Sequence, residues 1–539
     1  MNRPWYKNYP YKEDVQIPEE SLYILLDKTV RLYGDQPAVI FEDKIVTYIE
    51  LKDQVDRLAS AWKELGYQKG ERIGLMLSNH PDYIISYYAA LSLGLIIVQV
   101  NPMYTPRELL QILYDSKLTY LVTDPPALET VRKVYDNYRF RHIMLSQMTV
   151  DHQEDDIFQN LDELKGHSKT FEKPVSISVH DDVAIIQYTG GTTGKMKGAM
   201  LTHYNLMANV IQSYAAYKGK LQLGQEVVLA ATPLYHVYAM TSAMNFGIFI
   251  GGTILLIRKF DIDYVLESIK KYRPTFFPGV PKMYNAFINH PQVESYGLDC
   301  IKVCSSGSAP LPVDVIKRFE YLTNAVISEG YGLSETSPTT HRNPTNGTRK
   351  VGSIGIPVPF TDCLIVDDYG QELPPMAIGE LLIRGPQVMK GYWGNKDETN
   401  KALQNDWLYT GDLAMMDQDG YFFIVGRKKE MIIVGGFNIY PQEVEGVLYE
   451  HPNIKEVAVA GIPNEVEGEI VKAYIVPKDG CQVDLEEVRG YCYQKLTRYK
   501  VPKEFEIRDS LPRNTVGKLL KRILIQEEKE KDSITTSSH

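Results

Sequence analysis

Residues 188–201 read YTGGTTGKMKGAML, and this stretch carries the strongest structural signal in the chain. An apolar, β-branched run of strand length, residues 183–188, precedes it, and residues 201–207 predict a helix that begins near Thr202. Glycines let backbone N–H groups turn inward, and threonines and lysines add hydroxyl donors and positive charge. The stretch predicts a triphosphate-binding loop, although a flexible glycine- and threonine-rich surface turn would have the same composition.

The residues of this loop that we assign to phosphate binding share small size, a hydroxyl group or a positive charge. They are Thr189, Gly190, Gly191, Thr192, Thr193, Gly194, Lys195 and Lys197. The loop is not a Walker A motif, because only three residues separate Gly190 from Gly194. In addition, Met196 stands where that motif needs a Ser or Thr for Mg²⁺.

Length and composition exclude several classes of protein. The chain has 539 residues, too many for a single core, so we expect at least two domains. Its 58 lysines and arginines face 68 acidic residues, and the net charge of −10 argues against a general nucleic-acid binder. Five cysteines without CxxC spacing indicate neither a disulfide framework nor a zinc site. These features are typical of a protein in a reducing cytoplasm.

Two uncharged stretches, residues 84–100 and 238–257, must be considered as possible membrane-spanning segments. The second is long enough to cross a bilayer. However, Gly251 and Gly252 divide it into a helix-like half and a β-branched half, which indicates helix, turn and buried strand. The N-terminus lacks the apolar segment of a signal peptide. We expect no transmembrane segment, and the sequence leaves peripheral contact with a membrane open.

The chain before and after the glycine-rich loop alternates between short apolar runs and helix-length segments. Residues 72–77, 96–100 and 120–123 are strand candidates before the loop, and residues 227–231 and 301–305 are candidates after it. This alternation predicts mainly parallel, helix-covered sheets. Ligands bind α/β folds at the carboxyl ends of such strands, so the residues that follow each run are candidates for a site.

The pattern of predicted secondary structure changes after Gly352. Closely spaced strand candidates and turns predict a β-rich subdomain up to Arg427. Beyond Arg427, a tail of about a hundred residues predicts the order ββαββαβ and has the size of an independent domain. The polar residues 525–539 are not expected to be ordered.

Five short motifs occur in the order and at the spacing of one enzyme family. They are YTGGTTGKMKG at residues 188–198, YGLSET at 331–336, WLYTGD at 407–412, GRKKEMIIVGGFN at 426–438 and PRNTVGK at 512–518. Together they resemble the AMP-forming acyl-CoA synthetases of the adenylate-forming superfamily. The resemblance runs from about Leu22 to Lys521, and it is strongest to fatty-acyl-CoA ligases, with coumarate-type CoA ligases next.

The resemblance implies an α/β fold with two domains. Residues 1–427 would form a large N-terminal domain of two helix-flanked β-sheets plus a β-barrel subdomain. Residues 428–539 would form a small, mobile α+β domain, with a hinge near Lys429. The implied reaction uses ATP, Mg²⁺ and coenzyme A. A carboxylate attacks the α-phosphate of ATP to give acyl-AMP and pyrophosphate, and the thiol of coenzyme A then displaces AMP.

The resemblance also assigns residues to the nucleotide. Glu335 would hold Mg²⁺ through an oxygen ligand, and Ser334 would donate to the α-phosphate. Asp412 would accept both ribose hydroxyls, because an ionised carboxylate is only an acceptor, and Arg427 would add a contact to ribose or phosphate. The other residues assigned to the nucleotide are Gly307, Ser308, Ala309, Pro310, Tyr331, Gly332 and Thr336. Polar turns and solvated charged residues would look the same outside these motifs.

Four further assignments concern the reacting groups. Lys518 would bridge the acyl carboxylate and the phosphate during adenylation, which suits a flexible ammonium group. Lys429 matches the hinge, and Gly436 matches the glycine beside the pantetheine channel, where a missing side chain permits close approach. His236 would lie near the substrate carboxylate and either assist deprotonation of the thiol or only pack and gate the pocket. Lysines at positions 429 and 518 are otherwise typical surface residues.

We expect a medium- to long-chain fatty acid–CoA ligase whose partners are the small molecules fatty acid, ATP and coenzyme A. An aryl-acid CoA ligase, acyl transfer to a carrier protein and a catalytically silent nucleotide-binding protein are the alternatives. The presence of all the residues assigned to the reaction argues against a silent protein. They are Thr193, Glu335, Asp412, Arg427 and Lys518. The sequence leaves the acyl chain length, the pathway and a homodimer open.

Overall fold

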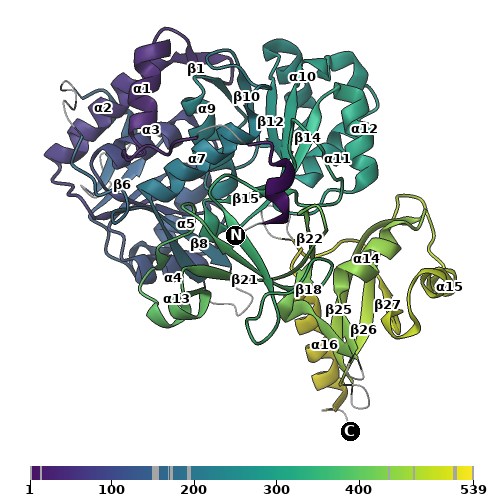
Figure 1. Ribbon diagram of the computed structural model, residues 1–539. Coiled ribbons are helices and arrows are strands. Elements are labelled where there is room, and N and C mark those ends of the chain that lie inside the picture. Colours follow the sequence, from purple (N-terminus) through teal and green to yellow (C-terminus); the bar gives the residue numbers. More distant parts are fainter. Residues whose placement is uncertain are drawn as a thin grey trace. The chain divides into compact units, whose positions relative to one another are not determined.

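We describe the protein from a computed structural model (Figure 1). The described residues are 3–11, 15–148, 157–167, 169, 171, 174–190, 196–434, 437–464, 468–513 and 519–536. They form two compact units, the first of residues Met1–Cys363 and Ile383–Leu408, the second of residues Leu364–Leu382 and Tyr409–His539. The expected domain boundary at residues 427–428 and the hinge near Lys429 stay predictions.

The first unit contains a nine-stranded sheet with a parallel centre. In spatial order its strands are β16 (Ile356–Pro357), β15 (Thr339–Arg342), β14 (Val326–Gly332), β13 (Val303–Ser306), β12 (Phe276–Gly279), β10 (Val227–Ala230), β11 (Thr253–Leu256), β1 (Pro37–Phe41) and β2 (Lys44–Thr47). The edge strands β2, β15 and β16 pair antiparallel.

The first unit also contains an eight-stranded sheet. Its order is β19 (Gly391–Tyr392), β9 (Met196–Thr202), β8 (Val183–Gly190), β4 (Ile96–Gln99), β3 (Arg72–Met76), β5 (Tyr120–Thr123), β6 (His142–Leu145) and β7 (Phe158–Asn160). The strands from β8 to β7 are parallel, whereas β9 and β19 are antiparallel. The predicted parallel, helix-covered sheets are therefore confirmed.

The helices of the first unit begin at recognisable capping residues. Thr47, Thr105 and Thr202 each accept a hydrogen bond from the third residue of the following helix, whose side chain bonds back in a capping box. The helices are α1 (Ile24–Tyr33), α2 (Tyr48–Glu64), α3 (Pro81–Ser92), α4 (Pro106–Ser116), α5 (Pro125–Tyr135), α6 (Leu161–Lys165), α7 (His203–Tyr217), α10 (Ile262–Tyr272), α11 (Pro281–Asn289), α12 (Val313–Thr323) and α13 (Lys396–Ala402). Short 3₁₀ turns are η1 (Pro4–Asn8), η3 (Val293–Tyr296), η4 (Leu298–Cys300) and η5 (Ser334–Thr336).

The uncharged stretch after Tyr238 folds as predicted, with one difference. It forms α8 (Val237–Ala239), a π-helical turn η2 (Met240–Asn245), α9 (Phe246–Phe249) and the buried strand β11. The sequence predicted a plain helix and gave no sign of the π turn, a feature that often lies at functional sites. Among the described residues, no helix combines the length and the apolar character that a bilayer crossing requires.

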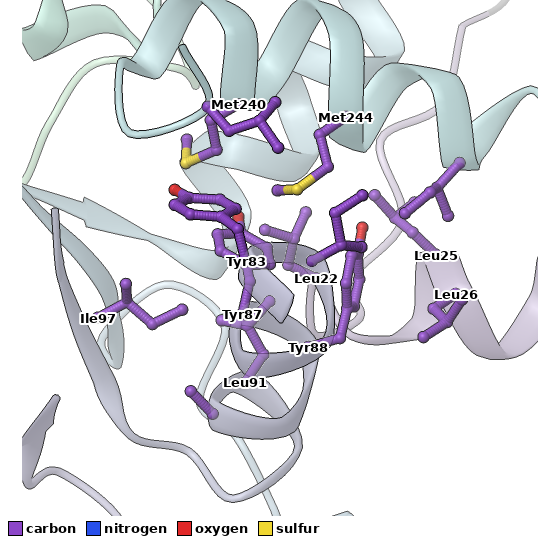
Figure 2. Packing of buried hydrophobic residues seen from close by; sticks show 14 of the residues in the cluster. Leu22, Leu25, Leu26, Tyr83, Tyr87, Tyr88, Leu91, Ile97, Met240 and Met244 are labelled. Carbon is purple, nitrogen blue, oxygen red and sulfur yellow. The ribbon is translucent and has the colours of Figure 1, made fainter. Parts of the chain in front are cut away.

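Apolar side chains fill both faces of the two sheets. On the nine-stranded sheet, Leu229 and Leu255 pack in the cluster with α10, α11 and α12, which lie together in Figure 1. The α4 and α5 helices cover the eight-stranded sheet in the same way. A third cluster lies on the opposite strand faces, where Tyr83, Tyr87 and Tyr88 of α3 pack with Met240 and Met244 of η2 (Figure 2).

The β-rich segment forms a five-stranded sheet. Its strands are β17 (Asp362–Val366), β18 (Ile378–Arg384), β20 (Leu403–Gln404), β21 (Trp407–Met416) and β22 (Phe422–Arg427). They pair in the order β17–β18–β21–β20, with β22 also on β21. The sequence predicted a β-rich subdomain here, and the resemblance implied a β-barrel; the structure shows the segment as this sheet.

The C-terminal part of the second unit has the predicted order ββαββαβ. Its elements are β23 (Ile432–Val434), β24 (Phe437–Ile439), α14 (Pro441–Tyr449), β25 (Ile454–Asn464), β26 (Gly468–Pro477), α15 (Leu485–Lys495), β27 (Glu504–Ile507) and α16 (Lys521–Thr536), with 3₁₀ turns η6 (Lys428–Glu430) and η7 (Arg498–Lys500). The helices α14 and α15 bury Leu448 and Val488 against the sheet.

The expectation of disorder after residue 524 was wrong, because α16 continues to Thr536. Leu524 at the start of this helix is fully buried. Glu528 accepts a hydrogen bond from the buried Lys472 at 2.8 Å, and Lys531 pairs with Glu506 at 3.1 Å. The helix is thus attached by the apolar side chains of Leu524 and Ile525 and by ion pairs, which composition alone does not reveal.

Candidate active site

The two ends of the predicted phosphate loop lie on the antiparallel strands β8 and β9. The strand β8 ends at Gly190 and β9 begins at Met196, with Thr189 opposite Lys197 in the antiparallel register. The sequence predicted α7 correctly but missed β9, whose glycine and lack of alternation gave no strand signal. Gly198 is required there, since a Cβ would lie 2.6 Å from the side chain of Ile186. Gly191, Thr192, Thr193, Gly194 and Lys195 lie outside the described residues.

Lys197 on β9 belongs to a cluster of charged and aromatic side chains. Its ammonium group forms an ion pair with Glu398 of α13 and lies 5.1 Å from the ring centroid of Tyr392. Hydrogen bonds from Lys197 and Lys401 lower the pKa of Glu398 to about 2. Glu398 is therefore ionised at neutral pH, and it holds the ammonium group of Lys197 at the end of the predicted phosphate loop.

Glu335 lies beside this cluster on the 3₁₀ turn η5. Its Oε1 accepts a hydrogen bond from the Tyr392 hydroxyl at 2.8 Å, and its backbone oxygen accepts from the amide of Met389 at 2.8 Å. Tyr392 thus connects the proposed metal ligand with Lys197. The sequence gave no signal for Tyr392 or Glu398, because only the pairing of β19 with β9 brings their segment to the hairpin.

A carboxylate in this position fits Mg²⁺. In the described part of the chain, no three His, Cys, Asp or Glu side chains gather as a metal-binding group. Mg²⁺ in phosphate-transfer sites commonly uses one or two carboxylates together with substrate phosphates and water, so a single Glu335 beside a phosphate loop suffices. Ser334 shares η5 with Glu335, whereas the hydroxyl of Thr336 donates to the Pro338 carbonyl at 2.5 Å and supports the turn.

The residues assigned to adenine follow two neighbouring parallel strands. Tyr331 and Gly332 end β14, and residues 307–310 follow β13 directly. A Cβ on Gly332 would lie 2.1 Å from the Pro338 oxygen, and a Cβ on Gly307 would lie 3.2 Å from the ring of Tyr238. Glycine is therefore needed at position 332, whereas a side chain at position 307 would require the Tyr238 ring to shift by a few tenths of an ångström. The turn continues through Ser308, whose φ of +70° is in the left-handed region, and through Ala309 and Pro310.

His236 precedes α8, and the residue is half-buried. Its Nε2 atom is buried and has no hydrogen-bond partner in the structure, and the ring of Tyr235 lies 4.6 Å away. Burial lowers the pKa of His236 to about 4. The imidazole is therefore neutral at physiological pH, the form that a base for thiol deprotonation requires. An imidazole that only packs and gates the pocket would also be neutral.

Buried neutral histidines make stability depend on pH. Burial lowers the pKa of His203 and His236 to about 4 and that of His341 to about 3. The unfolded chain takes up protons on these imidazoles below about pH 6.5, whereas the folded chain does not until about pH 4. Stability is therefore fully present above about pH 6.5 and is lost as the pH falls.

We expect His236→Gln to flatten this dependence. Between about pH 7.5 and about pH 5, each such histidine lowers the free energy of unfolding by about 2 kcal/mol. Urea unfolding at both pH values measures the difference. The matched control is His180→Gln, since His180 is exposed and pairs with Glu19 at the surface. An unchanged pH dependence in the His236 variant would contradict the buried, neutral state.

The second unit holds the residues assigned to the ribose. Asp412 on β21 lies opposite Arg427 on β22, and the Arg427 Nε lies 2.7 Å from the Asp412 Oδ1. Asp412 is buried, and its amide donates to the hydroxyl of Thr410 at 3.0 Å. Lys429 is exposed on η6, two residues after Arg427. Gly436 and Lys518 lie outside the described residues.

Comparison with known proteins gives a consistent relationship over the whole chain. The profile of the AMP-binding enzyme family matches residues 26–393, and that of the AMP-binding enzyme C-terminal domain matches residues 443–518. A long-chain-fatty-acid–CoA ligase of Bacillus subtilis (strain 168) is 40% identical over 99% of both chains. A feruloyl-CoA synthase of Amycolatopsis sp is 36% identical over 92% of this chain and 96% of its own. The crystal structure of ATP-bound MatB from Rhodopseudomonas palustris has a TM-score of 0.85 and 29% identity, over 95% of this chain and 99% of that chain. Because the first profile alone spans more than half of its length, this chain belongs to the AMP-binding enzyme family.

Proposed function

We propose that this chain is an AMP-forming acid–CoA ligase that activates medium- to long-chain fatty acids. The enzyme uses ATP to convert the fatty acid to acyl-AMP and then forms the thioester with coenzyme A, releasing AMP and pyrophosphate. The observation that carries this proposal is the full-length similarity to a long-chain-fatty-acid–CoA ligase. The connection from the glycine-rich hairpin through Lys197 and Tyr392 to Glu335 supports it.

The adenylation step needs cations and hydrogen-bond donors rather than a base. A fatty acid is ionised at neutral pH, so repulsion between its carboxylate and ATP is the main obstacle. Lys197 and the backbone of the glycine-rich turn would bind the β- and γ-phosphates, and Glu335 would hold Mg²⁺. When bound, Mg²⁺ neutralises charge on the phosphates and on the pyrophosphate leaving group. Lys518 would add positive charge between the carboxylate and the α-phosphate.

We infer that two further sets of residues orient the nucleotide. Tyr331 and residues 307–310 offer an aromatic face and backbone groups for adenine. Asp412, held in place by its ion pair with Arg427, offers a carboxylate for the ribose hydroxyls. For the thioester step, a turn of the C-terminal part about Lys429 would replace Lys518 by the glycine at position 436, with neutral His236 near the thiol. These roles stay predictions, as do a homodimer and peripheral membrane contact.

We expect AMP release that depends on coenzyme A and that peaks between octanoate and oleate. The assay supplies ATP and Mg²⁺ and compares acetate, octanoate, palmitate, oleate and coumarate, each with and without coenzyme A. An apolar acyl pocket strengthens binding by about 0.8 kcal/mol for each buried methylene, so the rate should rise steeply with chain length up to the pocket's limit.

The other outcomes favour the alternatives. Preference for coumarate would indicate an aryl-acid ligase, which the similarity to a feruloyl-CoA synthase makes the second candidate. Acid-dependent AMP release that does not respond to coenzyme A would indicate another acceptor, such as a carrier protein. No acid-dependent AMP release at all would contradict the proposed function.

A further inference from the structure

Arg342, the last residue of β15, carries a buried positive charge that no carboxylate among the described residues neutralises. Its side chain is 2% exposed. The structure places no carboxylate within ion-pair distance of the guanidinium group in the described residues. An unpaired charge in a protein interior is strongly unfavourable, whereas a charge with a bound counter-ion is tolerated.

The guanidinium group also has unused hydrogen-bond donors. Its Nη2 donates to the hydroxyl of Thr339 at 3.2 Å, and the Tyr217 ring lies 4.8 Å from Cζ. Within the described part of the chain, both Nε and Nη1 are buried without a hydrogen-bond partner, and so is the hydroxyl of Tyr217. The ring contact offsets part of the cost of burying the charge, but it satisfies neither N–H direction.

Arg342 pairs with the strand that leads into the predicted adenine site, but its side chain lies on the sheet face opposite to that of Tyr331, because Tyr331 pairs with His341. Arg342 is directly opposite Gly330 in the β14–β15 ladder, one residue before Tyr331. The unpartnered Nη1 lies 3.7 Å from the position that a Cβ of Gly330 would occupy, so a side chain at position 330 would lie against the guanidinium group. A larger residue at position 330 would cover it.

A second hydrogen-bonded group lies close to the same strands. The hydroxyl of Tyr238 lies 2.7 Å from the Ser305 hydroxyl and donates to the Ser305 carbonyl at 3.0 Å. Tyr238 follows His236 by two residues and packs against Gly307. Tyr238 therefore connects the segment that carries His236 with β13 and with the turn at Gly307.

We propose that Arg342 binds a second carboxylate at the far end of the acid substrate, so that the enzyme prefers dicarboxylic fatty acids to monocarboxylic ones. This inference rests on the proposed function and specifies its substrate class. Two N–H groups of a guanidinium match the two oxygens of a carboxylate, and the pair neutralises the buried charge. The methylene chain between the two carboxylates would lie among the apolar residues of the pocket.

The test compares acids of equal chain length with one and two carboxylates. The pairs are hexanoate and adipate, octanoate and suberate, and palmitate and hexadecanedioate, with coenzyme A-dependent AMP release as the readout. The wild-type enzyme should show a kcat/KM at least about tenfold higher for the dicarboxylate in one of these pairs. In Arg342→Met, the ratio of dicarboxylate to monocarboxylate kcat/KM for that pair should fall by about a hundredfold.

Two further variants separate recognition from folding. Arg349→Met removes an arginine that already has a carboxylate partner, Glu320, and should leave the ratio unchanged. Arg342→Lys keeps the charge and loses the paired donors, so the ratio should fall by about tenfold even if the methionine variant does not fold.

The possible outcomes are distinct. Preference for the monocarboxylate in every pair, with a ratio that Arg342→Met or Arg342→Lys does not change, would overturn the inference while leaving the fatty acid–CoA ligase intact. The same fall in Arg349→Met as in Arg342→Met would also overturn it, because the effect would then be structural. No AMP release with any acid would overturn this inference and the proposed function together.

Discussion

Lys518→Ala is expected to slow adenylation by more than about a hundredfold and to leave thioester formation from supplied acyl-AMP intact. The carboxylate must approach a highly charged triphosphate, and one cation placed between them stabilises the transition state by several kcal/mol. Pyrophosphate release from ATP and fatty acid measures the first half-reaction. Acyl-CoA formation from synthetic acyl-AMP and coenzyme A measures the second.

The test for Lys518 is whether its substitution slows adenylation but not thioester formation. Lys529→Ala is the matched control, because Lys529 is an exposed lysine on α16 in the same unit, and both rates should stay within about twofold of the wild type. Equal losses in both half-reactions would contradict a role in adenylation and would indicate damage to the C-terminal domain. A small loss in pyrophosphate release would mean that another cation neutralises the approaching carboxylate.

The sequence predicts the helices and strands that have a regular hydrophobic pattern or a capping residue. It does not predict elements that depend on contacts with residues far away in the sequence. The β-branched run before the glycine-rich loop and the capping residue Thr202 define β8 and the start of α7, and both predictions are confirmed. The strand β9 was missed because its pairing with β8 and β19 depends on position in the sheet rather than on alternation. The π turn η2 and the end of α16 likewise depend on tertiary packing and ion pairs.

The same distinction holds for the site. Motif residues such as Glu335 and Tyr331 were predicted because short segments at the ends of strands carry a recognisable order of residues. Tyr392 and Glu398 have no motif of their own and reach the hairpin only through a two-stranded pairing. The sequence assigned no role to Arg342, and only its burial without a carboxylate partner among the described residues singles it out.

Glu335→Gln is expected to lower the rate of adenylation by a hundredfold or more and to raise the Mg²⁺ concentration needed for half-maximal rate. Glutamine keeps the shape and an oxygen that accepts the Tyr392 hydrogen bond, so the turn η5 should remain in place. It loses the negative charge that a hard divalent cation requires of its ligand. Mg²⁺ titrations of pyrophosphate release, at a fixed concentration of ATP, measure both quantities.

Tyr392→Phe separates the metal ligand from the residue that positions it. This variant keeps the carboxylate of Glu335 and the aromatic ring over which Lys197 lies, and it removes only the hydroxyl that donates to Oε1. Loss of one hydrogen bond to a charged group costs about 1.5–3 kcal/mol at most, and partial replacement by water reduces this, so we expect the rate of adenylation to fall by about tenfold.

An unchanged Mg²⁺ requirement in Glu335→Gln would contradict metal binding by this carboxylate. A larger loss in Tyr392→Phe than in Glu335→Gln would assign the main role of the cluster to the tyrosine and Lys197, and the carboxylate would then serve only to hold the tyrosine.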